Sequence, residues 1–218
     1  MKTDGQLQQD VMEELKWEPA VEASTIGVEA KDGVVTLAGH VETYAQKWAA
    51  ERAAQRVSGV KGVVVEIDVS LPGSSRRKDA DLVQAACSAL DWNSSVPPGR
   101  IRILVSDGVV TLSGEVDWAF QRSAAIAAVR NLIGVRGLDN QITLKPHPVR
   151  IGDVKKKIHS ALQRQAQLDA KAISIDVDGT SVTLGGVVDS WSERAAARNA
   201  AWSVPGVQYV IDNLSVAD

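Results

Sequence analysis

The side chains that could act as nucleophiles or metal ligands are few and lie far apart in this sequence. The single cysteine, Cys87, has no partner for a disulfide bond within the chain and stands among alanines on a predicted helix, so we expect it to fill the core. His40, His147 and His159 are not spaced with thiols or carboxylates as in a zinc site. No serine lies in a Gly-x-Ser-x-Gly elbow. The sequence therefore predicts no catalytic residue, no metal and no cofactor.

Glycines recur in three similar segments and could in principle cradle a phosphate. The segments read Val-Thr-Leu-x-Gly-x-Val and span residues 35–41, 110–116 and 182–188. Their glycines Gly39, Gly114 and Gly186 lack the further glycines and the Lys-Ser/Thr pair of a phosphate loop. We interpret them as glycines of a structural turn or bulge, and the same structural reading applies to a second set of glycines, Gly59, Gly134 and Gly206.

Tryptophan is the unusual residue of the composition, with six copies against one phenylalanine and two tyrosines. Trp17 and Trp92 occupy equivalent places after a predicted helix, and Trp118 and Trp191 lie near the start of another. One interpretation has these side chains covering small cores, because large aromatics contribute much of the burial in small domains. The other has them anchoring the protein at a membrane interface, where indole rings sit at the headgroup level. The sequence leaves both open.

The charge of the chain excludes some partners and allows others. A net charge of -3 provides no global field for attracting nucleic acid. Two basic runs remain, Arg-Arg-Lys at 76–78 and the lysines Lys155, Lys156 and Lys157. Each cation near an anionic leaflet contributes about 1 kcal/mol, so a run of three predicts weak, salt-sensitive binding. The alternative is an ordinary solvated face.

The organisation of the chain follows from an internal repeat. The motif glycines are separated by 114 − 39 = 75 and 186 − 114 = 72 residues, and a Gly-Val step follows each of them after 20 residues. An Asp-Gly pair precedes each motif, with one extra residue between turn and strand in the third copy. This period is that of a very small domain, so we expect three domains with separate cores.

Each copy has the pattern of an α-β-β-α-β unit. In the second copy, alternation over 101–105 and 110–113 around Asp107-Gly108 predicts a β-hairpin with a tight turn. An alanine-rich helix and a last strand follow. A first helix is expected at 7–15, 81–90 and 154–162, with Val83 and Leu90 on the inner stripe of the second. The predicted fold class is α+β, with three tandem domains that each pack a three-stranded mixed sheet against two helices.

Turn-rich and proline-rich stretches give the domain boundaries. We expect domains at 1–71, 79–145 and 150–218, joined by linkers at 72–78 and 146–149. No apolar run approaches the roughly 20 residues of a membrane-spanning helix, and the first residues do not resemble a secretory signal. These features predict a soluble cytoplasmic protein that touches membranes only peripherally.

The combined motifs resemble the BON domain of the OsmY-like family, a bacterial module, three times along almost the whole chain. The resemblance rests on the Val-Thr-Leu-x-Gly-x-Val strand, on the helix start at Glu193-Arg194-Ala195 and on the closing segment 134–140. Asn140 of that segment is replaced by Val65 and Asp212 in the other copies. The resemblance implies a non-catalytic protein that binds phospholipid surfaces or serves in envelope-associated assemblies, in a stress context such as osmotic stress.

Three hypotheses follow for the function. In the first, the three units bind an anionic phospholipid surface together, with avidity from linked weak sites. In the second, the chain is a protein-interaction scaffold that pairs through exposed sheet edges or helix faces with a partner or with itself as a homo-oligomer. The third, a potassium sensor, is implied only by the resemblance, because another member of the family is associated with that ion.

Overall fold

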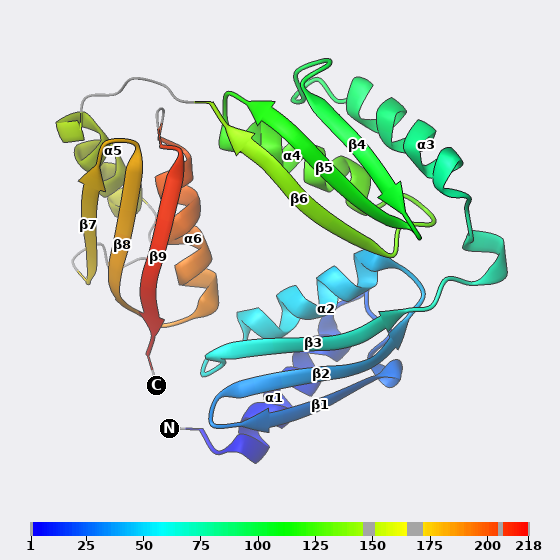
Figure 1. Cartoon of the computed structure of the whole chain (residues 1–218). Helices are drawn as coiled ribbons and strands as arrows, with labels where there is room; N and C mark the ends of the chain where they lie inside the picture. Colours follow the sequence, from blue (N-terminus) through cyan, green and yellow to red (C-terminus); the bar gives the residue numbers. More distant parts are fainter. Residues whose placement is uncertain (1, 146–150, 165–171, 205–206, 218) are drawn as a thin grey trace.

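The chain folds into three domains of like architecture, seen in a computed structural model that describes residues 2–145, 151–164, 172–204 and 207–217 (Figure 1). Domain 1 contains α1 (Asp4–Trp17), β1 (Ile26–Lys31), β2 (Val34–Val41), α2 (Tyr44–Arg56) and β3 (Gly62–Val69). Domain 2 contains α3 (Asp79–Asp91), β4 (Ile101–Ser106), β5 (Val109–Val116), α4 (Ala119–Arg130) and β6 (Gly137–Leu144). Domain 3 contains α5 (Ile151–Arg164), β7 (Ile173–Asp178), β8 (Ser181–Val188), α6 (Trp191–Trp202) and β9 (Tyr209–Val216). Short 3-10 helices occur at Ala23–Thr25 and Gly73–Ser75.

Every sheet places the motif strand in the middle. In domain 1, β2 pairs antiparallel with β1 and parallel with β3, and domains 2 and 3 repeat this arrangement. The register repeats as well, because the motif glycine always pairs with the first residue of the preceding strand. The predicted α+β class, with a mixed three-stranded sheet and two helices per domain, is confirmed.

Two-residue turns close all three hairpins. Asp32 and Gly33 have φ of 53° and 84°, and Asp107 and Gly108 have 51° and 77°, the left-handed values that type I′ turns require. In domain 3 the loop is Gly179-Thr180, and Asp178 is the last residue of β7. The expectation of one extra residue between turn and strand in the third copy is therefore wrong. The strands keep their length, and the glycine has moved to the first turn position, as type II′ turns prefer.

The motif glycines lie inside strands and allow a close backbone approach. Gly39, with φ of 139°, pairs within a continuous ladder between β1, β2 and β3. A Cβ there would lie 2.1 Å from the carbonyl oxygen of Thr25, and Gly114 and Gly186 meet backbone oxygens at 2.2 and 2.0 Å. The motif glycines are thus not part of a turn or bulge, as we expected from the sequence. Glycine is required at these positions because a second backbone segment passes too close for a side chain.

Three separate hydrophobic clusters form the cores, one in each domain. In domain 1, the first helix contributes the buried residues Leu7, Val11 and Leu15 at four-residue spacing. The second helix contributes alanines at positions 49, 50, 53 and 54, whose small side chains let it lie close to the sheet. The prediction of three cores is confirmed for the described residues.

Two details of the second copy differ from expectation. Leu82, Ala86 and Leu90 form the buried stripe of α3, whereas Val83 is only half-buried. Cys87 is exposed, so the prediction that it fills the core is wrong. Successive helical residues are rotated by about 100°, and Cys87 follows Ala86 on the side turned away from the sheet.

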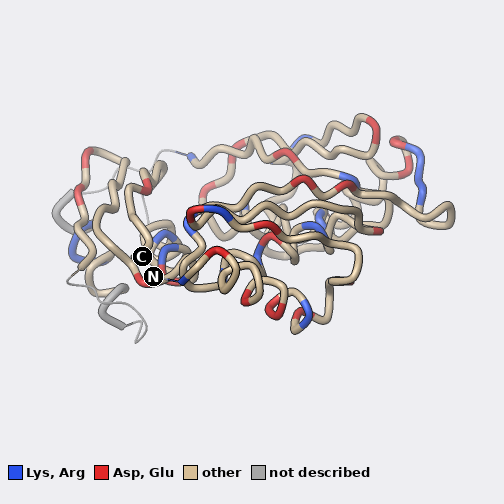
Figure 2. The backbone as a smooth tube through the Cα atoms, turned by 90° about the horizontal axis from the view of Figure 1, so that it is seen from below, with Lys and Arg blue, Asp and Glu red and all other residues tan. Residues whose placement is uncertain are grey.

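The second helices of the domains lie toward the middle of the molecule. In Figure 1, α2 and α6 flank the space between the domains, and α1, α3 and α5 lie farther out. Figure 2 shows basic and acidic residues mixed along all three domains. None of the helices in the described ranges is both long and apolar enough to cross a bilayer.

Candidate functional site

Two tryptophans project from equivalent ends of the first helices. Trp17 is the last residue of α1 and is 83% exposed, and Trp92 directly follows α3 and is 90% exposed. Such high exposure leaves almost the whole indole ring in contact with solvent. These two residues therefore do not cover the domain cores.

The other two predicted tryptophans have different surroundings. Trp118 occupies the residue before α4 and is 37% exposed. Trp191 begins α6 in domain 3 but packs against the core of domain 1, and its indole Nε1 is buried without a hydrogen-bond partner in the structure. The Arg194 guanidinium lies 4.7 Å from the Trp191 ring centroid. The structure thus places Trp191 at a contact between domains.

The lysines of the predicted basic run are solvent-exposed on one helix. Lys155, Lys156 and Lys157 lie on α5 between the buried residues Val154 and Ile158. Three successive residues of a helix spread over about 200° of its circumference. The run therefore covers the outer surface of α5 as a band of positive charge.

The other basic run lines a cavity at the start of domain 2. Arg76, Arg77 and Lys78 lie beside the first residue of α3, and Arg136 approaches from the loop before β6. The cavity has a volume of about 690 Å³. Arg77 Nη1 donates hydrogen bonds to the carbonyl oxygens of Ser74 and Arg76. Four cationic side chains line this cavity, and the sequence prediction of site residues did not include Arg136.

The remaining sequence candidates are dispersed. His40 and His159 are exposed on different domains, and His147 and Gly206 lie outside the described residues. The described part of the chain has no cluster of three or more histidine, cysteine or acidic side chains that could hold a metal ion. Gly59 and Gly134 have φ of 95° and 101° in the loops after the second helices, which only glycine adopts readily.

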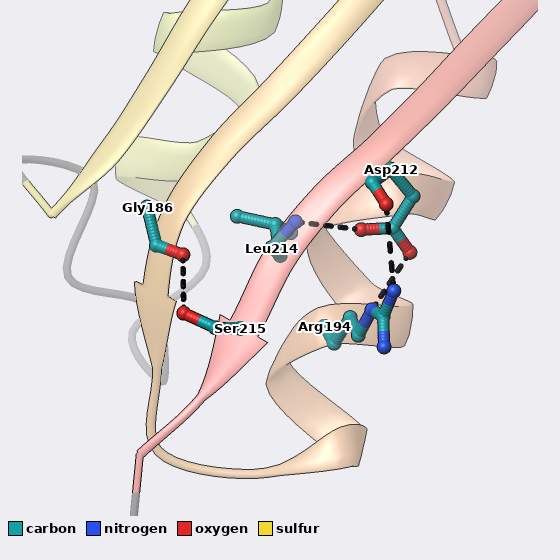
Figure 3. A network of polar contacts seen from close by, with 5 residues as sticks. All are labelled: Gly186, Arg194, Asp212, Leu214 and Ser215. Atoms are coloured by element: carbon teal, nitrogen blue, oxygen red, sulfur yellow. Dashed lines mark hydrogen bonds and ion pairs between the residues drawn. The ribbon is translucent and has the colours of Figure 1, made fainter. Parts of the chain in front are cut away.

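A polar network joins the second helix to the last strand of domain 3 (Figure 3). Arg194 Nε donates to Asp212 Oδ2 at 2.9 Å, and Asp212 Oδ1 accepts from the Leu214 amide at 3.2 Å. Both charged side chains are largely buried, with 23% and 14% exposed. Domain 1 uses Lys47 at the same position, where Nζ donates to the Ile67 carbonyl at 2.7 Å. These residues stabilise the fold and form no open site.

Sequence reasoning missed the aromatic contacts between domains. The Arg130 Cζ atom lies 3.5 Å from the Trp48 ring centroid, and the Arg122 Cζ atom lies 4.5 Å from that of Trp202. Each pair joins domain 2 to another domain. No local pattern could have revealed them, because the partners are 80 or more residues apart in the chain (202 − 122 = 80 and 130 − 48 = 82).

Comparison with known proteins identifies the family. The model of the BON domain matches residues 3–70, 78–146 and 152–218, so the chain belongs to the BON domain family, in three tandem copies. The matched model is not that of an enzyme family.

Among characterised proteins, the chain is similar to the osmotically-inducible protein Y of Escherichia coli (strain K12). The identity is 30% over 129 residues, which cover 57% of this chain and 64% of that protein. The match thus spans less than two thirds of the relative's length.

Two solved structures of CdsD, a structural protein of the type III secretion system of Chlamydia trachomatis, also match. They are 16% identical, with TM-scores of 0.28 and 0.27. The alignments cover 96% and 97% of this chain and 91% and 98% of those chains.

Proposed function

We propose that this protein associates peripherally with anionic phospholipid surfaces and catalyses no reaction. The observation that carries the proposal is the exposure of Trp17 and Trp92 at equivalent ends of two first helices. An indole with an apolar body and a polar N–H is suited to the headgroup level of a bilayer. A repeated position gives two anchors on one chain, and linked weak sites bind a surface with avidity.

Exposed cations support the same proposal. Lys155, Lys156 and Lys157 on α5 and the basic run at 76–78 are solvent-accessible. At about 1 kcal/mol per cation close to an anionic leaflet, each run adds a few kcal/mol that salt would remove. The similarity to an osmotically-inducible protein favours a role in a stress response such as osmotic stress.

Vesicle flotation tests the proposal. We expect the protein to float with vesicles containing phosphatidylglycerol and not with pure phosphatidylcholine vesicles, and we expect added salt to release it. The double substitution Trp17→Ala with Trp92→Ala should lower the bound fraction severalfold. Phe120→Ala, which removes another exposed aromatic ring, is the matched control and should bind normally. Equal flotation of the double variant and wild type would refute the proposal.

A charge variant tests the contribution of α5. Replacing Lys155, Lys156 and Lys157 by alanine should weaken binding to anionic vesicles. A control variant that removes three dispersed exposed cations, Lys31, Arg102 and Lys145, has the same net charge. If both variants bind alike, net charge explains the effect and α5 has no special role.

A scaffold function is the second candidate, and one observation favours it. The sheet surfaces opposite the helices carry exposed apolar side chains, among them Leu104 at 66% and Tyr209 at 65%. Tyr209 lies on β9, an edge strand that could pair with another chain. Concentration-dependent association in analytical ultracentrifugation, lost in Tyr209→Lys, together with an absence of vesicle binding, would favour the scaffold.

A further inference from the structure

The contacts between domains converge on the three second helices. α4 of domain 2 contacts both other domains, one near each of its ends: Arg122 stacks on Trp202 of domain 3, and Arg130 stacks on Trp48 of domain 1. A guanidinium within about 6 Å of a ring centroid is attracted by the negative face of the ring, and the attraction is stronger when the pair is desolvated. All four side chains are half-buried, so the attraction is stronger here than at a fully exposed site.

Apolar packing accompanies the stacking. Tyr44 of α2 and Trp202 of α6 both pack against the core of domain 2, and Trp191 of α6 packs against the core of domain 1. Gln208 Nε2 also donates to the Leu144 carbonyl at 3.0 Å, joining domain 3 to domain 2. Each pair of domains is therefore in contact, including domains 1 and 3, which are not neighbours in the sequence.

Equivalent positions make these contacts in a constant direction. Tyr44 and Trp191 both lie five residues after their motif glycine (44 − 39 and 191 − 186). Tyr44 of domain 1 contacts domain 2, and Trp191 of domain 3 contacts domain 1. Each residue therefore contacts the domain that comes after its own, when domain 1 is counted as coming after domain 3. Arg130 and Trp202 both lie 16 residues after the motif glycine of their domain (130 − 114 and 202 − 186), and each contacts the domain before its own. Head-to-tail contacts of this kind close into a ring when the rotation allows.

We propose that α2, α4 and α6 form a clasp that closes the three domains into a single ring and holds it by stacking arginines on aromatic rings. The clasp is defined here by Tyr44, Trp48, Arg122, Arg130, Trp191 and Trp202. This inference does not depend on the proposed lipid binding. It does add a consequence, because closure leaves α1, α3 and α5 on the outer side of the ring (Figure 1).

Among the described residues, like charges act on the two stacked arginines of α4. Burial lowers the pKa of Arg122, and the charge of Arg198 from domain 3 lowers it further. Burial likewise lowers the pKa of Arg130, Tyr44 opposes that change, and Arg52 of domain 1 adds to it. Positive charges thus face each other across both contacts of α4. Screening by salt weakens such repulsion, so the ring should persist, and close further, at high ionic strength.

Single-molecule energy transfer between domains 1 and 3 tests the clasp. Dyes are attached to cysteines introduced by Gln9→Cys and Ser160→Cys, in a chain whose native cysteine is removed by Cys87→Ser; all three positions are exposed. We expect one narrow distribution for this reference chain in 0.1 M salt and again in 0.5 M salt. A broad distribution, as for three domains moving independently, or opening at 0.5 M salt would overturn the proposal.

Substitutions in the clasp give the second arm of the test. Trp48 lies outside the hydrophobic core of domain 1, so Trp48→Ala should leave the domain folded while broadening the distribution. Arg130→Gln should have the same effect, and the double variant should be no worse than either single variant. Trp17→Ala, at an exposed tryptophan outside the clasp, is the control and should match the reference. An unchanged distribution in Trp48→Ala, with circular dichroism confirming the fold, would show that the clasp does not hold the ring.

Discussion

Replacing Gly39 by alanine should severely destabilise domain 1. The Cβ of the alanine would lie 2.1 Å from the carbonyl oxygen of Thr25, which is more than 1 Å closer than ordinary contact. The obstacle is backbone at the start of β1, so no side chain can rotate to make room. The residue also has φ of 139°, a conformation that alanine rarely adopts.

The size of the effect follows from these two costs. An unfavourable backbone conformation costs about 1–3 kcal/mol, and moving β1 away from β2 weakens the packing of Ile26 and Val28 in the core. We expect a loss of about 3 kcal/mol or more. A domain of this size has roughly 4–10 kcal/mol of stability in total, so the substitution should remove a third or more of it.

Hydrogen exchange read by mass spectrometry locates the damage, and urea unfolding measures it. Protection should fall across 26–41 and 62–69 and remain unchanged within the sheet of domain 3. The matched control is Gly5→Ala in α1, where a Cβ meets nothing within 4 Å. That change should stabilise the helix by about 0.5–1 kcal/mol. Equal unfolding midpoints for Gly39→Ala and wild type would refute the explanation of the motif glycine.

Three further outcomes are expected. A double-mutant cycle with Arg194→Met and Asp212→Asn should give a coupling of about 1–3 kcal/mol, because this charged hydrogen bond is largely buried; a coupling near zero in urea unfolding would contradict the network of Figure 3. Burial raises the pKa of Tyr44, and Glu51 raises it further, so its stabilising effect is fully present below about pH 10 and is lost as the pH rises through the folded pKa. Tyr44→Phe should therefore make the urea midpoint less sensitive to pH in that alkaline range, and an identical alkaline profile would contradict this. Thr3→Ala removes the capping box of α1 and should cost about 1 kcal/mol in thermal unfolding; no change in melting temperature would show that the cap is not needed.

The elements were predictable because their signals are local. Alternation around Asp107-Gly108 identifies the hairpin, and four-residue spacing identifies the helices. Predictions from local patterns were wrong at two places, the third hairpin turn and Cys87. The third Asp-Gly pair suggested an inserted residue, whereas constant strand length moves the turn to Gly179-Thr180. Cys87 was placed inside because alanines surround it, although the stripe through Leu82, Ala86 and Leu90 excludes it.

The tryptophans show the limit of sequence reasoning about sites. Trp17 and Trp92 occupy matching positions and share one environment, so the repeat predicted their equivalence. Trp191 has a tryptophan's preference for burial, but its partner is the core of another domain. That contact depends on how the domains are arranged, and the arrangement depends on side chains distant in the sequence. A pattern within one copy carries no information about it.

Quenching of tryptophan fluorescence by brominated phosphatidylglycerol most directly tests the claim that the exposed indoles enter a membrane interface. Vesicles carrying bromine on the acyl chains should quench the wild-type protein. The variant with Trp17→Phe and Trp92→Phe, which keeps the other four tryptophans, should lose most of the quenching. Undiminished quenching in that variant, or none in the wild type bound to vesicles, would contradict the account.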